Sequence, residues 1–164
     1  MSQGGFTLIE LLVAVSVVGV LATIAMPQMN FAIQNSRVRT AVSDTHTSLL
    51  LARSEAIKRN TNVSLERSSG SWLGGWSVEA GGTALSVQDP LEGVTVECYT
   101  TPNASTNCGS TLTFARTGRA GSYIEFRYYN DDNTDIPMRC VKVDLSGRPG
   151  VTVDGNGDPS DGCN

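Results

Sequence analysis

The sequence is poor in the residues that enzymes use for chemistry. It has one histidine, His46, and none of its four cysteines stands at the C-x-x-C spacing of a zinc site. No P-loop, GxGxxG or Ser-His-Asp pattern is present. Charged residues make up only 17% of the chain, and the net charge of −4 argues against general nucleic-acid binding. We therefore expect a protein that is not an enzyme and needs no cofactor or metal.

Charge is scarcest near the N-terminus, where the segment from Phe6 to Met26 carries a single ionisable side chain, that of Glu10. As a helix this segment would span roughly 31 Å, about the thickness of a bilayer core. A conventional signal peptide would need a basic segment before the apolar run and a cleavage site after it. Nothing basic precedes Phe6, and the small residues Gly4 and Gly5 lie before the run. The pattern predicts a membrane-inserted helix.

Glu10 is the exception within this apolar segment. An ionised carboxylate in a membrane costs about 2.5–3.5 kcal/mol on insertion scales, so it needs a partner or a role. Cleavage after Gly5 would give Phe6 a free amine, and the Glu10 of one subunit could face the Phe6 amine of the next. The alternative is that Glu10 reaches the lipid headgroups from its place near the helix start.

Gly5-Phe6-Thr7-Leu8-Ile9-Glu10 and the apolar run after it resemble the class III signal sequence of type IV prepilins and type II secretion pseudopilins. The resemblance implies that prepilin peptidase cleaves between Gly5 and Phe6 and N-methylates Phe6. It also implies that Glu10 serves in subunit docking and in extraction from the membrane. The leader Met1–Gly5 departs from the family pattern because it lacks the usual Lys or Arg.

Beyond the apolar run the sequence predicts a helix that continues to about Arg59. Pro27 removes a backbone donor and is expected to kink this helix. One apolar stripe then recurs at helical spacing, and Leu50 and Ile57 are expected to widen it. The stripe consists of Val38, Val42, Thr45, Leu49, Ala52 and Ala56. The stretch 52–60, ARSEAIKRN, resembles the helix end of the GspH/FimT family of minor pilins and pseudopilins.

Residues 60–164 read as a β-rich head, because short runs rich in Val, Thr and Tyr alternate with Gly, Asn, Asp and Pro. Candidate strands are 61–66, 75–79, 94–99, 111–115, 122–129 and 138–144, and Trp72 and Trp76 are expected to anchor a turn in the core. The fold class is therefore α+β, a long N-terminal helix packed on an antiparallel sheet in the manner of pilins. The expected domains are a leader (1–5), a transmembrane half-helix (6–27), an amphipathic half-helix (28–59) and a periplasmic head (60–164).

The four cysteines Cys98, Cys108, Cys140 and Cys163 all lie in the head, and their even number favours disulfides in an oxidising compartment. Three pairings are possible. The sequential one, Cys98–Cys108 and Cys140–Cys163, is favoured because it closes short local loops.

The resemblance implies a minor pilin at or near the tip of a type IV pilus, which helps to prime assembly. Its expected partners are other minor and major pilins, prepilin peptidase and the inner-membrane assembly platform. Before assembly the chain would cross the inner membrane once with its head in the periplasm, and afterwards it would lie in the cell-surface pilus. A minor pseudopilin of type II secretion is one alternative.

DNA binding for natural transformation is a second alternative, disfavoured by the sequence. Some family members bind DNA through a Gly-Arg-x-Arg motif, and this chain has Gly147-Arg148-Pro149-Gly150, which lacks the second arginine. Residues 149–164 contain three aspartates and no basic residue. The remaining candidate contacts are Arg148, Arg116 and Arg119, with Arg127, Arg139 and Lys142 as further members of a patch.

Overall fold

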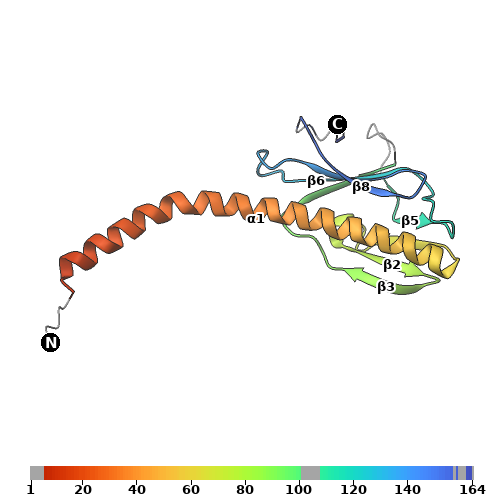
Figure 1. Ribbon diagram of the computed structural model, residues 1–164, viewed down its shortest axis with the longest axis horizontal. Helices are drawn as coiled ribbons and strands as arrows, with labels where there is room; N and C mark the ends of the chain where they lie inside the picture. Colours follow the sequence, from red (N-terminus) through yellow and green to blue (C-terminus); the bar gives the residue numbers. More distant parts are fainter. Residues whose placement is uncertain (1–5, 101–107, 157, 159–161, 164) are drawn as a thin grey trace. The chain divides into compact units, whose positions relative to one another are not determined.

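The computed structural model describes residues 6–100, 108–156, 158 and 162–163, apart from the side chains of residues 24–27. The chain forms two compact units, Met1–Ile33 and Gln34–Asn164. The first unit holds the N-terminal part of the long helix. The second unit holds the rest of that helix together with the eight strands found among the described residues (Figure 1).

Helix α1 runs from Leu8 to Arg59 and ends in a Schellman motif. Asn60 adopts a left-handed backbone conformation with φ of 51°. The Asn60 N–H donates to the Ile57 carbonyl, and the Thr61 N–H donates to the Ala56 carbonyl, both at 3.2 Å. These two bonds satisfy carbonyls that a helix end would otherwise leave open. The helix therefore ends at Arg59, and the first strand begins shortly afterwards at Val63.

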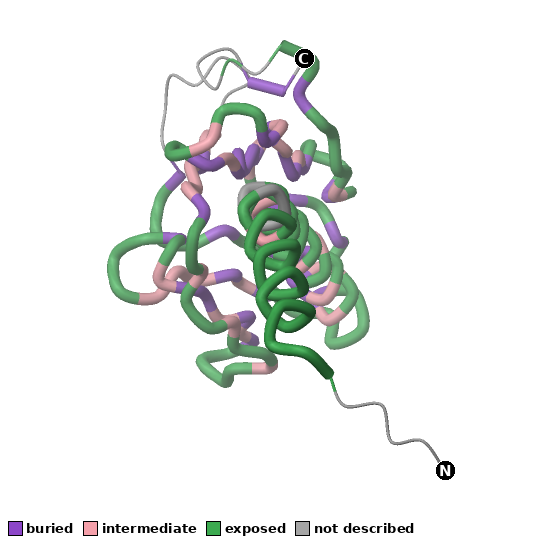
Figure 2. The backbone as a smooth tube through the Cα atoms, turned by 90° about the vertical axis from the view of Figure 1, so that its left-hand side faces the viewer, coloured by how far each residue is buried: buried purple, intermediate pink, exposed green. Residues whose placement is uncertain are grey.

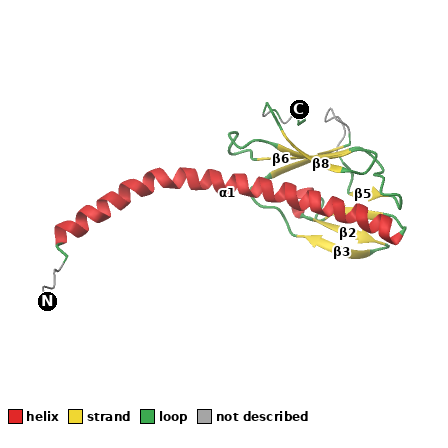
Figure 3. Ribbon diagram, viewed as in Figure 1, coloured by secondary structure: helices red, strands yellow, loops and turns green. Residues whose placement is uncertain are grey.

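Two four-stranded antiparallel sheets make up the head (Figure 3). The first has the order β3-β2-β1-β5 and the second the order β4-β6-β7-β8. The strands are β1 (Val63–Arg67), β2 (Trp76–Ala80), β3 (Thr83–Gln88), β4 (Thr95–Tyr99), β5 (Thr111–Phe114), β6 (Ile124–Tyr129), β7 (Arg139–Val143) and β8 (Pro149–Val153). The expected α+β fold is confirmed, with two sheets in place of one, and strands β3 and β8 were not predicted.

The predicted apolar stripe of α1 is the face that packs in the core. All six of its residues are buried, and the five apolar ones share one apolar cluster with residues of both sheets (Figure 2). The hydroxyl of Thr45 hydrogen-bonds to that of Tyr128 on β6, so the single polar group of the stripe is satisfied there. The expected widening by Leu50 and Ile57 is wrong, because both are about half exposed. Ala41 and Ser48 are buried instead.

The two tryptophans anchor a tight turn in the core, as the sequence predicts. Trp72 lies in a short 3₁₀ helix, η1 (Trp72–Gly74), and its ring meets the edge of Phe126 on β6 at 5.1 Å between centroids. Trp76 begins β2 and is almost fully buried. Between them Gly75 has φ of 85°, and an added Cβ would lie 2.2 Å from the Gln88 carbonyl oxygen. Only glycine fits this close approach of two strands.

Strand β6 is buried on both faces, although its alternating sequence predicts one solvent-facing side. Ile124, Phe126 and Tyr128 belong to the apolar cluster. On the other face Arg127 and Glu125 are completely enclosed, and Arg127 Nε donates to Glu125 Oε1 at 2.9 Å. Arg127 also lies over the ring of Tyr99, 4.5 Å from its centroid. The expectation that Arg127 belongs to a surface patch is therefore wrong.

The segment Gly162–Cys163 covers this charged pair. An added Cβ on Gly162 would lie 2.7 Å from Arg127 Nη2 and 2.9 Å from Glu125 Oε1. Cys163 is bonded to Cys140 on β7, and the Lys142 ammonium donates to its carbonyl oxygen at 2.5 Å. The other disulfide joins Cys98 to Cys108, so the bonds are the sequential pairs. The Cys140–Cys163 bond therefore holds in place the residues that exclude water from the ion pair.

Candidate subunit-docking site

Helix α1 starts with a capping box formed by Thr7 and Glu10. The Glu10 N–H donates to Thr7 Oγ1 at 3.3 Å, and the Thr7 N–H donates to Glu10 Oε2 at 3.4 Å. The T-x-x-E spacing is a known helix-start signal, which the sequence analysis left unused. Both backbone groups lie after the Gly5–Phe6 bond, so the cap does not depend on the residues of the predicted leader.

The helix after this cap presents apolar side chains on all of its sides. Ten large apolar residues between Leu8 and Leu21 are each more than half exposed in the N-terminal unit. They are Leu8, Ile9, Leu11, Leu12, Val13, Val15, Val17, Val18, Val20 and Leu21. A helix that is apolar all round is stable in lipid or among other apolar helices, but not alone in water. Glu10 is the only charged side chain among them.

Within the described residues, no single helical segment is both long and apolar enough to cross a membrane. The adjoining pieces Leu8–Thr23 and Gln28–Arg59 meet that test together, across a bend. Pro27 falls between the two pieces, where side chains are not described, and its kink stays a prediction. Gly5 also lies outside the described residues, so the cleavage site stays a prediction as well.

A second group of predicted site residues comes together at two touching turns of the head. Gly118 lies in the turn after β5 and Gly147 in the turn after β7. A Cβ added to Gly147 would lie only 1.9 Å from the Gly118 carbonyl oxygen. The exposed Arg116 and Arg119 flank Gly118, and the exposed Arg148 follows Gly147. Contact between the two glycines therefore gathers all three arginines at one edge of the head.

The C-terminal end of α1 adds charge beside these turns. A Cβ added to Gly118 would lie 2.6 Å from Ile57 Cδ1 and 3.3 Å from Arg53 Nε. Between these two residues along the helix, Glu55 forms ion pairs with both Lys58, at 3.0 Å, and Arg59, at 2.5 Å. The hydrogen bond from Arg59, with a second from Lys58, lowers the pKa of the Glu55 carboxyl. Glu55 therefore stays ionised and cancels part of the basic charge at this helix end.

Asp144 lies in the turn that carries Arg148, and its position reduces the positive potential there. The Ser146 hydroxyl and backbone N–H both donate to Asp144 Oδ1. The bond from the Ser146 hydroxyl is the main cause that lowers the pKa of Asp144, so the carboxylate is charged at neutral pH. Among the described residues, no three His, Cys, Asp or Glu side chains are grouped so that they could hold a metal ion.

Both the helix start and the head match known protein families. A family model for the prokaryotic N-terminal methylation motif matches residues 1–26. A second family model, described as type II transport protein GspH, matches residues 41–147, about two-thirds of the chain. The chain belongs to the GspH family.

Individual proteins match different parts of this GspH-family chain. The type IV major fimbrial protein FimA of Dichelobacter nodosus is 49% identical over 43 residues, which are 26% of this chain. The match spans 28% of the length of that curated relative.

The crystal structure of the type IV minor pilin FimU of Pseudomonas aeruginosa matches 79% of this chain and 96% of its own. The TM-score is 0.58 at 19% identity. The minor pseudopilin EpsH from the type 2 secretion system of Vibrio cholerae matches 70% of this chain and 94% of its own, with a TM-score of 0.51 at 12% identity. At such identities these two matches show the fold alone.

These matches confirm a pilin fold in a family of structural pilins and pseudopilins. The methylation motif and the apolar helix start together indicate a membrane-anchored pilin. The capping box fixes the Glu10 carboxylate at the start of α1.

Proposed function

We propose that this chain is a minor type IV pilin that lies at or near the tip of the pilus and helps to prime its assembly. The observation that carries the proposal is the combination of the methylation motif at residues 1–26 with a GspH body at residues 41–147. The fold likeness to the minor pilin FimU supports the same assignment. The partners would be other minor and major pilins, prepilin peptidase and the inner-membrane assembly platform.

The proposed mechanism rests on the N-terminal unit. Cleavage after Gly5 would give Phe6 a free amine, and Glu10 of one subunit would pair with that amine on its neighbour. The capping box uses Glu10 Oε2 for its bonds to Thr7. A carboxylate accepts about four hydrogen bonds in all, so it can hold the cap and still receive an ammonium. The exposed apolar side chains would meanwhile pack against the helices of neighbouring subunits.

Mass spectrometry of the natural protein tests this proposal. We expect the membrane pool to begin at an N-methylated Phe6, and we expect sheared pili to contain far fewer copies of this chain than of the major pilin. Deletion of the gene should leave few filaments, since priming would fail. A chain that keeps Met1, or that equals the major pilin in abundance along the filament, would contradict a priming role. Neighbouring genes of a secretion system would favour the pseudopilin alternative.

Binding of DNA is a second candidate function, and one structural observation favours it. Arg116, Arg119 and Arg148 are exposed on two turns that touch through Gly118 and Gly147. Clustered arginines of this kind bind phosphates without reading the base sequence. Asp144 lies in the turn that carries Arg148 and is ionised, so the surface is only moderately basic.

If DNA binds there, replacing all three arginines with glutamine should weaken binding and flatten its salt dependence. Each lost phosphate contact should reduce the slope of log K against log salt by about 0.9 for duplex DNA. The measurement is a gel shift or anisotropy titration of the full chain in detergent at several salt concentrations. Arg39→Gln, an exposed arginine on α1, serves as the matched control. Equal binding by the triple variant and the control would exclude this surface.

A further inference from the structure

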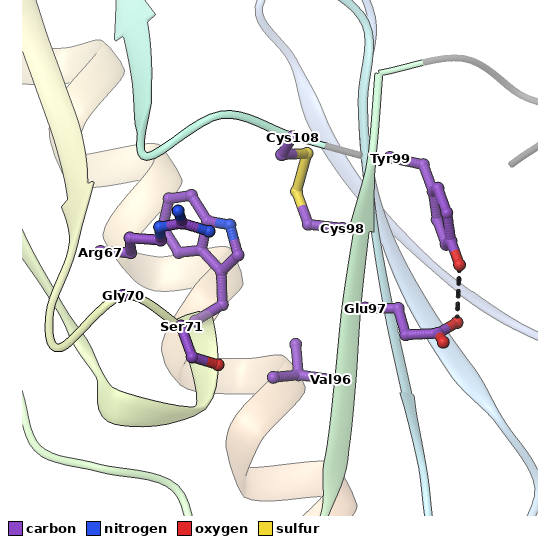
Figure 4. A pocket seen from close by; sticks show the side chains of 9 residues that line it. Arg67, Gly70, Ser71, Val96, Glu97, Cys98, Tyr99 and Cys108 are labelled. Atoms are coloured by element: carbon purple, nitrogen blue, oxygen red, sulfur yellow. Dashed lines mark hydrogen bonds between the residues drawn. A yellow bond between two sulfur atoms is a disulfide. The ribbon is translucent and has the colours of Figure 1, made fainter. Parts of the chain in front are cut away.

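A cleft in the head is lined by residues other than those of the N-terminal unit and the two arginine-bearing turns. It has a volume of about 230 Å³, several times the roughly 30 Å³ share of a water molecule. One wall comes from the end of β1 and the turn into η1, and the other comes from β4 and its disulfide (Figure 4). The lining residues are Arg67, Gly70, Ser71, Trp72, Val96, Glu97, Cys98, Tyr99 and Cys108.

Arg67 brings a positive charge to the lining of this cleft. Its side chain is half-buried, its Nε is shielded from solvent, and no described residue accepts a hydrogen bond from that Nε. No carboxylate of the described residues forms an ion pair with it. A guanidinium that is partly removed from water and left unpaired is costly, and burial favours an anionic partner.

The acid nearest in the lining does not neutralise Arg67. Figure 4 shows Arg67 on the side of β4 where Val96 and Cys98 point, whereas Glu97 and Tyr99 extend from the opposite side. The Tyr99 hydroxyl donates to Glu97 Oε2 at 2.9 Å. That bond helps to raise the pKa of Tyr99, behind the larger effect of burial, so the hydroxyl remains a donor to Glu97. The Glu97 carboxylate is therefore engaged by Tyr99 on the same strand, β4.

Trp72 supplies a second donor in the same lining. Only 5% of the Trp72 surface is exposed, and its indole Nε1–H has no partner among the described residues. A buried N–H without an acceptor loses about 1–3 kcal/mol relative to a satisfied one. Two side chains that line one cleft, Arg67 and Trp72, therefore each carry an N–H donor without a partner among the described residues.

We propose that this cleft binds a carboxylate, which the Arg67 guanidinium and the Trp72 indole N–H would hold together. A carboxylate supplies the negative charge that would neutralise Arg67 and the acceptor lone pairs that both N–H donors require. The carboxylate could be that of a free small acid or that of an acidic side chain on another protein chain. The proposal does not depend on the position of this subunit in a filament.

The test follows the indole signals of the full chain in detergent micelles. The chain has only two tryptophans, so Trp76→Phe assigns the Trp72 Nε1–H resonance in a proton–nitrogen NMR spectrum. The probes are sodium acetate, N-acetylglutamate amide and the uncharged N-acetylglutamine amide. We expect a saturable shift of the Trp72 resonance with one or both carboxylates and none with the glutamine compound. Tight binding of acetate would indicate a free acid, and preference for the glutamate compound would indicate a side chain.

Matched variants separate binding from folding. Arg67→Gln should weaken carboxylate binding about tenfold or more, the usual effect of removing a charged hydrogen-bond donor. Arg39→Gln, at an exposed arginine of α1 outside the cleft, should leave binding unchanged. A thermal melt checks that both variants fold. The proposal is overturned if no carboxylate shifts the Trp72 signal, if the glutamine compound shifts it equally, or if folded Arg67→Gln binds as well as wild type.

Discussion

Replacing Glu10 with valine is expected to reduce incorporation of the subunit into filaments by about a hundredfold or more, the effect of losing a pair worth roughly 3 kcal/mol. The predicted peptidase site between Gly5 and Phe6 is untouched, so cleavage should continue. The variant would therefore accumulate in the membrane as a mature, unassembled chain. Quantitative mass spectrometry of sheared filaments and of the membrane fraction measures both pools.

Two further variants distinguish the docking role of Glu10 from its role in the helix cap. Glu10→Gln keeps an acceptor for the Thr7 N–H but removes the charge, so it should fail almost as fully as the valine variant. Thr7→Ala removes the cap hydroxyl and should cost only about 1 kcal/mol of helix stability. Its incorporation should therefore fall little. Wild-type levels of Glu10→Gln in filaments would show that the carboxylate acts only as a cap.

Replacing Arg127 with methionine is expected to destabilise the head by about 3–5 kcal/mol, since it leaves the Glu125 carboxylate buried and without its partner. Both side chains are fully enclosed, and the Arg127 Nε–Glu125 Oε1 distance is 2.9 Å. The Tyr123 hydroxyl, which donates to Glu125 Oε2 at 2.6 Å, cannot replace a guanidinium. Thermal melts of the full chain in detergent should show a fall in Tm of about 10 °C or more.

The double variant Glu125→Leu with Arg127→Met provides the control for this prediction. Apolar side chains of similar volume often replace a buried ion pair at little cost, so most of the lost stability should return. Arg119→Met, on an exposed turn, should change stability by no more than about 0.5 kcal/mol. A loss below about 1 kcal/mol in the Arg127→Met variant would mean that water reaches Glu125 in solution.

The long helix and its buried face could be predicted from the sequence because both depend on local spacing. Residues three and four apart lie on one face of any helix, and this rule identified Val38, Leu49 and Ala56 before the fold was known. The width of the face depends on which strands approach it. Ile57 was assigned to the core by spacing, yet it lies at the rim, against the turn that contains Gly118.

The two missed strands, β3 and β8, are both edge strands, and this explains why their sequences gave little signal. Strand β3 is mostly exposed, so selection for alternating apolar residues is weak there. Strand β8 begins with Pro149 and Gly150, which ordinarily argue against a strand. An edge position tolerates both residues, but only the pairing with β7 reveals that position.

The candidate sites depended on the fold to different degrees. Glu10 was identified from sequence because a carboxylate in an apolar run is unusual in itself. Arg116 and Arg148 are far apart in sequence, and only the contact of Gly118 with Gly147 brings their turns together. The carboxylate cleft was not predicted at all, since Arg67 and Trp72 look like an ordinary strand residue and a core anchor. The cleft is indicated by N–H donors without acceptors, and a donor can be recognised as lacking an acceptor only when its neighbours in the fold are known.

The cover over strand β6 makes the enclosure of the ion pair depend on the redox state of the chain. Gly162 lies against Arg127 and Glu125, and its neighbour Cys163 is bonded to Cys140 on β7. Reduction of that bond would remove the covalent tether of the cover, and water could then reach the two charges. A chain that stops short of Gly162 would expose the same pair.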